Sequence, residues 1–159
     1  MQFFYYCLFV AGIVAADQIT KALVVAHIPL GGHMDFLPGF LDFTYLRNTG
    51  AAFSILSGQR TFFLILTAVF LAGVVWCVVK KKLPRPYLWI LAVITGGAIG
   101  NLIDRTVNGF VIDMFELEFI NFAVFNVADL FITFGAGALA IYALFFDKPK
   151  KDVPDDRTV

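Results

Sequence analysis

Residues 61–79 read TFFLILTAVFLAGVVWCVV and contain no charged side chain. A helix of roughly 20 apolar residues is long enough to cross the hydrocarbon core of a bilayer, which is about 30 Å thick. This stretch therefore predicts a transmembrane helix. Working outward from it, similar apolar stretches predict further spans at residues 3–26, 87–104 and 127–146. We expect an all-α polytopic membrane protein with four transmembrane helices.

The composition of the whole chain favours the same class. The chain has 159 residues, of which 60% are hydrophobic and 15% are charged. A soluble domain is nearer half apolar and a quarter charged, and a soluble fold of this composition would expose too much apolar surface. The length predicts one membrane-embedded domain over residues 1–159. Basic residues are not interleaved with exposed aromatic residues, so nucleic acid is not an expected partner.

Basic residues indicate how the chain crosses the membrane. The loop 80–86 and the tail 147–159 hold eight Lys and Arg residues, whereas the segments 27–60 and 105–126 hold three. Because basic loops stay in the cytoplasm, we expect both termini to be cytoplasmic and both segments to share the outer face. A cleaved signal peptide ending at Val14-Ala15-Ala16 is the alternative. It is disfavoured because no Lys or Arg precedes the apolar run.

Ionisable residues inside apolar spans are costly and need an explanation. Asp17 and Lys21 are four residues apart on one helical face, so we expect an ion pair that faces the bundle interior. At the end of the third span, Gly96 and Gly100 form a pattern typical of close helix packing. The neighbours Asp104 and Arg105 are interpreted as a structural charge network at the membrane surface.

Two more carboxylates are predicted at the outer boundary. The alternating residues before Asp113 predict a short strand on the membrane surface. Asn126 is the expected N-cap of the fourth span, with Asp129 in its first turn, where the helix dipole favours the ionised form. Taken alone, Asp113 fits a solvated loop residue and Asp129 fits a helix cap.

If Asp113 and Asp129 converge, they can share one proton, as the two carboxylates of an aspartic protease do. One carboxylate would activate a water molecule, and its protonated partner would donate to the scissile carbonyl. On the dipole argument we favour Asp129 as the ionised member. The alternative for a membrane protein with buried carboxylates is a small proton- or ion-coupled transporter. The clustering of polar residues at one end and the lack of an internal repeat disfavour transport.

The segment 47–54, RNTGAAFS, is rich in small residues that permit close approach of a peptide backbone. Asn48 is expected to hydrogen-bond either that peptide or a catalytic carboxylate, unless the segment is only a turn before the second span. The two histidines, His27 and His33, have no zinc-ligand spacing, and the sequence lacks HExxH, GxSxG and SxxK. A metalloprotease and a serine hydrolase are therefore disfavoured.

Five segments in this order resemble the motif set of the lipoprotein signal peptidases, also called signal peptidase II. They are DQITK at 17–21, RNTGAAF at 47–53, GGAIGNLIDR at 96–105, GFVID at 109–113 and FNVAD at 125–129. The resemblance implies an aspartic endopeptidase of the bacterial cytoplasmic membrane, with its active site at the outer face. Its substrate would be a diacylglyceryl-modified prolipoprotein embedded among membrane lipids, cut on the amino side of the lipidated cysteine.

The resemblance also implies roles for individual residues. Asp113 and Asp129 would form the catalytic pair, and neither a metal nor an organic cofactor would take part. The residues that would line or support the site are Asn48, Gly50, Gly97, Asn101, Arg105, Asn126, Asp17 and Lys21. A small β-cradle and a short amphipathic helix would lie on the outer face. The chain departs from the family pattern at Met114 and Leu130, so we expect differences at the edge of the pocket.

Overall fold

The computed structural model describes residues 2–51, 53, 55–80 and 83–146. These residues form four long helices and three strands. Their order is α1 (Gln2–His27), β1 (His33–Leu37), β2 (Leu41–Asn48), α2 (Arg60–Val79), α3 (Arg85–Val107), β3 (Val111–Leu117) and α4 (Val127–Phe145). The basic residues counted above at 81–82 and 147–159 lie outside the described residues.

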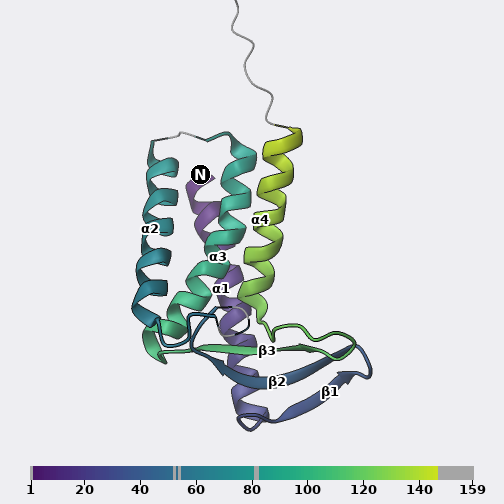
Figure 1. Ribbon diagram of the computed structural model, residues 1–159. Helices are drawn as coiled ribbons and strands as arrows, with labels where there is room; N and C mark the ends of the chain where they lie inside the picture. Colours follow the sequence, from purple (N-terminus) through teal and green to yellow (C-terminus); the bar gives the residue numbers. More distant parts are fainter. Residues whose placement is uncertain (1, 52, 54, 81–82, 147–159) are drawn as a thin grey trace, which may run out of the picture.

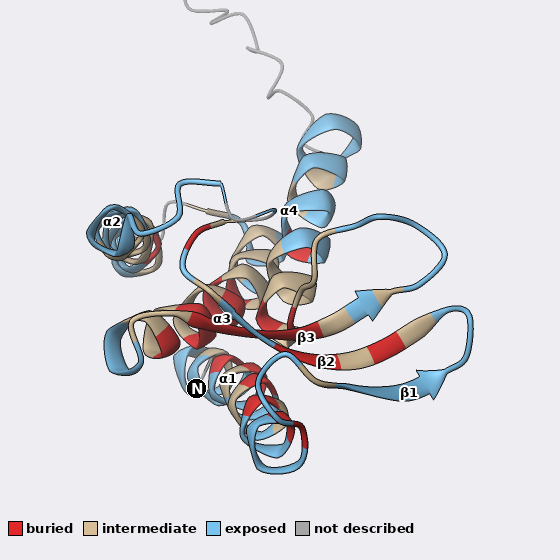
Figure 2. Cartoon of the chain, turned by 60° about the horizontal axis from the view of Figure 1, so that its bottom comes forward, coloured by how far each residue is buried: buried red, intermediate tan, exposed pale blue. Residues whose placement is uncertain are grey.

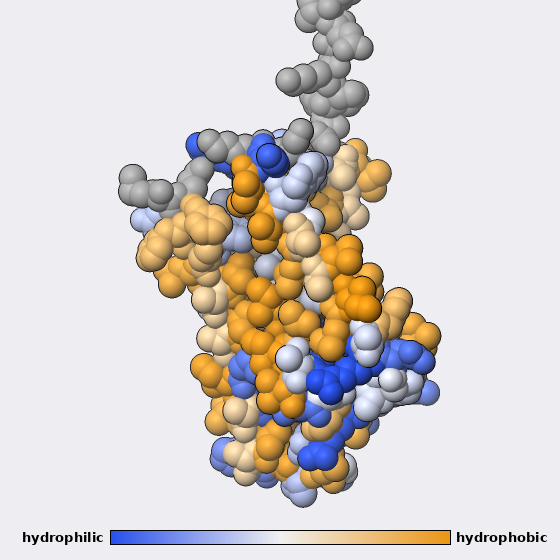
Figure 3. All heavy atoms as spheres, turned by 90° about the vertical axis from the view of Figure 1, so that its left-hand side faces the viewer, coloured by the Kyte–Doolittle hydropathy of each residue, from blue (hydrophilic) through white to orange (hydrophobic). Residues whose placement is uncertain are grey.

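All four helices are long and apolar enough to cross a membrane, and they coincide with the four predicted spans. α3 lies at the centre of the bundle and packs against α1, α2 and α4 (Figure 1). The surface has a broad hydrophobic belt between two more hydrophilic ends (Figure 3). This distribution matches a bundle whose sides face lipid and whose ends face water.

A three-stranded antiparallel sheet in the order β1-β2-β3 extends from one end of the bundle (Figure 1). β1 and β2 come from the segment 27–60 and β3 from the segment 105–126. The two segments therefore meet at one end, as predicted, while the N-terminus lies at the other end. That the sheet end is extracytoplasmic is predicted by the distribution of basic residues alone.

The sheet places Asp113 because side chains alternate between its faces. Ile112 and Met114 join Tyr45 of β2 in a buried cluster with Val24 and Ile28 of α1. Asp113 lies between them in sequence, so its side chain projects from the opposite face. Burial is concentrated where the sheet meets the helices, and the far end of the hairpin is exposed (Figure 2).

Glycines let α3 approach its neighbours closely, as the sequence predicted. A Cβ atom on Gly96 would lie 2.6 Å from Ile13 of α1, and one on Gly97 would lie 2.4 Å from the Ala128 carbonyl oxygen of α4. One on Gly100 would lie 2.5 Å from a carboxylate oxygen of Asp17. All three distances are well below van der Waals contact. The backbone of α3 therefore touches both helices that carry polar residues of the site.

We expect Gly97→Ala to destabilise the protein by about 1–3 kcal/mol, because the added methyl group forces α3 and α4 apart. Gly73→Ala in α2 is the matched control, since a Cβ atom there meets nothing within 4 Å. Thermal unfolding in detergent measures the difference. Equal melting temperatures for the two variants would contradict this packing argument.

No α-helix is assigned to the described residues of 28–59 and 108–126, so the short amphipathic helix on the outer face stays a prediction. Between β2 and α2, residues 49–51 and 55–59 include turns and bends. Phe53, Leu56 and Gly58 have φ values of 54°, 57° and 79°. Left-handed residues cannot continue a right-handed helix, so the chain turns here before α2 begins.

Candidate active site

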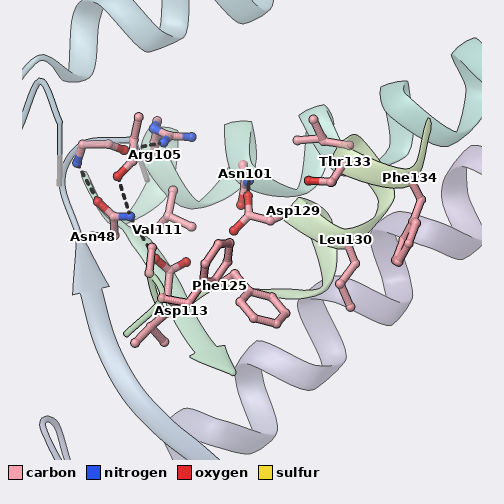
Figure 4. A pocket seen from close by; sticks show the side chains of 16 residues that line it. Asn48, Asn101, Arg105, Val111, Asp113, Phe125, Asp129, Leu130, Thr133 and Phe134 are labelled. Carbon is pink, nitrogen blue, oxygen red and sulfur yellow. Dashed lines mark hydrogen bonds between the residues drawn. The ribbon is translucent and has the colours of Figure 1, made fainter. Parts of the chain in front are cut away.

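A cavity of about 290 Å³ lies where β3, α3 and α4 meet (Figure 4). Asp113 and Asp129 both line it, and Asn48, Asn101 and Arg105 stand at its polar side. Aromatic and aliphatic side chains complete the lining, among them Val111, Phe122, Phe125, Leu130, Ile132 and Phe134. The structure thus brings the two carboxylates predicted from sequence to one partly apolar cavity.

Asp113 is held at both carboxylate oxygens. It is 3% exposed. Asn126 Nδ2 donates to its Oδ1 over 2.7 Å, and Asn48 Nδ2 donates to its Oδ2 over 2.9 Å. The two donors come from opposite sides of the site, Asn126 from the start of α4 and Asn48 from the end of β2. The carboxyl group of Asp113 is therefore fixed in orientation.

Asp129 is held by the N-terminus of its own helix and by α3. Asn126 caps α4, because its Oδ1 accepts the Asp129 N–H over 2.9 Å. In return, Asp129 Oδ2 accepts the Asn126 N–H over 3.2 Å, which completes a capping box. Asn101 Nδ2 donates to the other oxygen, Oδ1, over 2.8 Å. The predicted N-cap is thus confirmed, and Asp129 has a defined position at the cavity wall.

The three asparagines share one arrangement that explains why each turns its amino group toward a carboxylate. In each of them a group that can only donate occupies the side-chain oxygen. Gly50 N–H donates to Asn48, Lys21 Nζ donates to Asn101 over 3.0 Å, and the Asp129 N–H donates to Asn126. The NH₂ groups must then face the carboxylates. The backbone N–H groups of Gly50 and Asp129 and the buried ammonium group of Lys21 therefore fix the orientation of the three asparagine amides.

The buried charges form a cluster of three rather than the predicted pair. Lys21 Nζ lies 2.9 Å from a carboxylate oxygen of Asp17 and 2.9 Å from one of Asp104. All three residues are at most 2% exposed. Gln18 Nε2 donates to both carboxylates over 3.1 Å. The prediction that Asp17 and Lys21 face the bundle interior is confirmed, and Asp104 is the partner that it missed.

This charged cluster positions the backbone next to each site carboxylate. Asp17 Oδ1 accepts the Ala128 N–H over 2.9 Å, one residue before Asp129. Asp104 Oδ2 accepts the Ile112 N–H over 3.1 Å, one residue before Asp113. The cluster therefore ties α1 and α3 to the two elements that carry the cavity carboxylates.

The predicted network between Asp104 and Arg105 is wrong. Consecutive residues of a helix point in different directions and do not face each other. Asp104 points inward to Lys21, whereas Arg105 Nη2 donates to the Gly50 carbonyl oxygen over 2.9 Å. The Arg105 guanidinium also lies 4.7 Å from the centre of the Phe63 ring. Arg105 thereby holds the turn after β2 at the cavity.

Burial and charge change the acidity of the site. Burial, together with the negative charge of Asp129, raises the pKa of Asp113 to about 6. The hydrogen bonds from Asn48 and Asn126 act in the opposite direction, because they stabilise the ionised form. Near pH 6 the Asp113 carboxyl group therefore exchanges a proton easily. Such a group can serve as a general acid or base.

Several residues that line the cavity could not be predicted from the sequence. Phe122, Thr133 and Phe134 line the cavity, but aromatic and small polar residues occur throughout this chain. Of the two departures from the family pattern, Leu130 lines the cavity, whereas Met114 is fully buried in the cluster under the sheet. Only Leu130 alters the cavity wall directly. Among the described residues, no group of three or more His, Cys, Asp or Glu side chains is placed to hold a metal ion.

Comparisons with known proteins give a consistent result. The family model described as "Signal peptidase (SPase) II" matches residues 9–145. The lipoprotein signal peptidase of Lactococcus lactis subsp. lactis (strain IL1403) is 48% identical over 142 residues, covering 89% of this chain and 93% of that protein. The lipoprotein signal peptidase of Streptococcus pneumoniae (strain ATCC BAA-255 / R6) is 44% identical over 135 residues, covering 83% of this chain and 87% of that protein. A solved structure described as a bacterial membrane enzyme is similar with a TM-score of 0.84 and 32% identity, covering 94% of each chain.

Proposed function

Because the chain belongs to the lipoprotein signal peptidase (signal peptidase II) family, we propose that Asp113 and Asp129 are its catalytic pair. The family assignment makes the chain an aspartic peptidase that removes signal peptides from prolipoproteins. The family assignment gives no support to the alternative that the chain is a small proton- or ion-coupled transporter. The observation that carries the proposal is the single cavity lined by both carboxylates, each with its own asparagine donors.

In the proposed mechanism the pair holds one proton and a water molecule. The ionised carboxylate takes a proton from the water, whose oxygen attacks the scissile carbonyl carbon. The protonated carboxyl group donates to the carbonyl oxygen, so the tetrahedral intermediate does not carry a free negative charge. When the intermediate collapses, the carboxyl group that took the water proton passes it to the departing nitrogen, the C–N bond breaks, and the other carboxylate regains a proton from a hydroxyl group as the carbonyl re-forms. Both carboxyl groups recover their starting state after one turnover.

The raised pKa of Asp113 favours Asp113 as the protonated member of the pair. This assignment agrees with the sequence argument that the N-terminus of α4 stabilises a negative charge on Asp129. Asn101 and the Asn126 backbone N–H also donate to Asp129. Asn48, Asn126 and Asn101 are therefore positioning residues in this proposal, and Lys21 acts through Asn101.

The substrate is proposed to be a diacylglyceryl-modified prolipoprotein, cut on the amino side of the lipidated cysteine at the outer face of the bacterial cytoplasmic membrane. The apolar wall of the cavity, with Phe125, Leu130 and Phe134, suits a substrate that arrives from the lipid phase. The Arg105 guanidinium group on the polar side of the cavity is placed to orient its peptide backbone.

Cleavage of a defined prolipoprotein by the purified protein tests this proposal. The lipid-modified substrate and the same chain without the modification are compared, and mass spectrometry gives the new N-terminus. We expect a product that begins at the lipidated cysteine and little cleavage of the unmodified chain. Equal cleavage of both substrates, or a cut at another bond, would contradict the proposed specificity.

The pH dependence of cleavage reports on the same pair. Because Asp113 must stay protonated, we expect kcat/KM to fall as the pH rises through its pKa, which is about 6 in the free enzyme. The amide of Asn48 stabilises the ionised form of Asp113. Asn48→Ala should therefore move this descending limb to higher pH, whatever its effect on the maximal rate. A limb that stays in place or moves to lower pH would show that Asn48 does not act on Asp113.

A further inference from the structure

A second cavity of about 360 Å³ lies at the end of the bundle opposite the sheet. It is lined by residues of α1, α2, α3 and the connection before α3, namely Phe3, Tyr6, Val78, Leu83, Arg85, Leu88 and Trp89. Most of this lining is apolar, and Arg85 is its one charged member. None of these residues takes part in the catalytic cavity. The second cavity is therefore a separate feature of the molecule.

The cavity exists because α2 is loosely attached to the bundle. Its packing is against α3, and Val74 is its one buried residue. Close-packed protein does not leave an apolar void of this size unfilled, since its lining would lose dispersion contacts. Because α1 and α2 are long and apolar enough to cross a membrane, the open side of the cavity faces lipid. The apolar group available to fill it is therefore an acyl chain.

The rim of the cavity is positively charged and has no negatively charged partner among the described residues. Arg85 and Lys80 are exposed, and neither forms an ion pair within the described part of the chain. No Asp or Glu occurs in residues 2–16, 60–80 or 83–103. A negative group that neutralises this rim must therefore come from outside the described residues. The bilayer supplies such groups as lipid phosphates.

Both tryptophans of the chain indicate the depth of this rim in the membrane. Trp76 lies about one helical turn before the end of α2, and Trp89 lies about one turn after the start of α3. Tryptophan concentrates at the boundary between headgroups and acyl chains. Lys80 and Arg85 lie one turn further out, which is the level of the lipid phosphates. The cavity extends inward from the level of Arg85 along Tyr6, Leu88 and Trp89, toward the level of the acyl chains.

We propose that this end of the protein binds one anionic phospholipid. Its phosphate contacts Arg85 and Lys80, and one acyl chain fills the cavity between α1, α2 and α3. The bound lipid completes the packing of α2, which the protein alone leaves open. The site is distinct from the catalytic cavity and does not depend on the proposed catalytic pair.

Native mass spectrometry of the full-length protein in detergent tests the charge requirement. The probes are phosphatidylglycerol, phosphatidylcholine with the same acyl chains, and water-soluble glycerol phosphate. We expect one retained phosphatidylglycerol, and about tenfold weaker retention in Lys80→Gln/Arg85→Gln. The matched control is Arg60→Gln, which removes an exposed basic residue at the sheet end and should retain the lipid fully.

Leu88→Trp tests the acyl chain separately, because the larger side chain occupies the cavity without changing the charge. It should weaken retention of phosphatidylglycerol to a similar extent. Prolipoprotein cleavage by each variant serves as the check on folding. Equal retention of phosphatidylcholine, equal retention by Lys80→Gln/Arg85→Gln, unchanged retention by Leu88→Trp, or equally tight binding of glycerol phosphate would each overturn the proposal.

Discussion

Replacement of either Asp113 or Asp129 by asparagine should reduce prolipoprotein cleavage by about 10³-fold or more. Asparagine has nearly the shape of aspartate, but it can neither take a proton from water nor supply one to the scissile carbonyl. General acid and base catalysis each contribute about 10²–10⁴-fold to such reactions. Because the two groups act as a unit, the double variant should lose little more activity than either single variant.

The matched control for these variants is Asp35→Asn. Asp35 lies on β1 of the same sheet, but it is exposed and far from the cavity lining. Its replacement should leave kcat/KM within about twofold of the unmodified protein, as expected for a surface position. Retention of more than a tenth of the activity by a folded Asp113→Asn or Asp129→Asn variant would remove that residue from the proposed catalytic pair.

Lys21→Met should cause the largest loss of stability. The methionine side chain has a similar length, but the change leaves Asp17 and Asp104 buried and facing each other without a cation. Removal of one partner from a buried ion pair costs roughly 3–5 kcal/mol. Asn101 also loses the donor that fixes its amide, so the Asn101–Asp129 hydrogen bond is no longer enforced. We therefore expect both a lower melting temperature and a lower kcat.

Two further variants separate charge burial from lost packing. Lys80→Met removes an exposed lysine at the end of α2 and should lower the melting temperature much less than Lys21→Met does. Adding Asp17→Asn and Asp104→Asn to Lys21→Met removes the uncompensated charges and should recover part of the lost stability. A Lys21→Met variant as stable as Lys80→Met would contradict the description of the charged cluster as a stabilising unit.

The sequence was sufficient to predict the features that depend on local pattern. The four spans follow from apolar length, the position of Asp113 on a strand follows from alternation, and the capping role of Asn126 follows from its spacing to Asp129. The glycine contacts of α3 were also predictable, since small residues four apart permit close packing. Each of these features is decided within a few neighbouring residues.

Features that depend on which helical faces meet could not be predicted. Asp104 was assigned to Arg105, its neighbour in sequence, because the position of Lys21 relative to α3 was unknown. The left-handed φ values at Phe53 and Leu56 after β2 could not be predicted, because they are unusual for such residues. The convergence of Asp113 and Asp129 likewise depends on asparagines from β2, α3 and α4, which only the folded chain brings together.

The central claim is that Asp113 and Asp129 form one coupled acid pair, and titration of the Asp113 carboxyl group tests it most directly. Infrared difference spectroscopy with isotope-labelled aspartate can follow this group in the unmodified protein and in Asp129→Asn. We expect the pKa of Asp113 to be about 6 in the unmodified protein. It should be clearly lower in Asp129→Asn, because the neighbouring negative charge that raises it is gone. An Asp113 pKa that is the same in both proteins would contradict the coupling and, with it, the proposed catalytic pair.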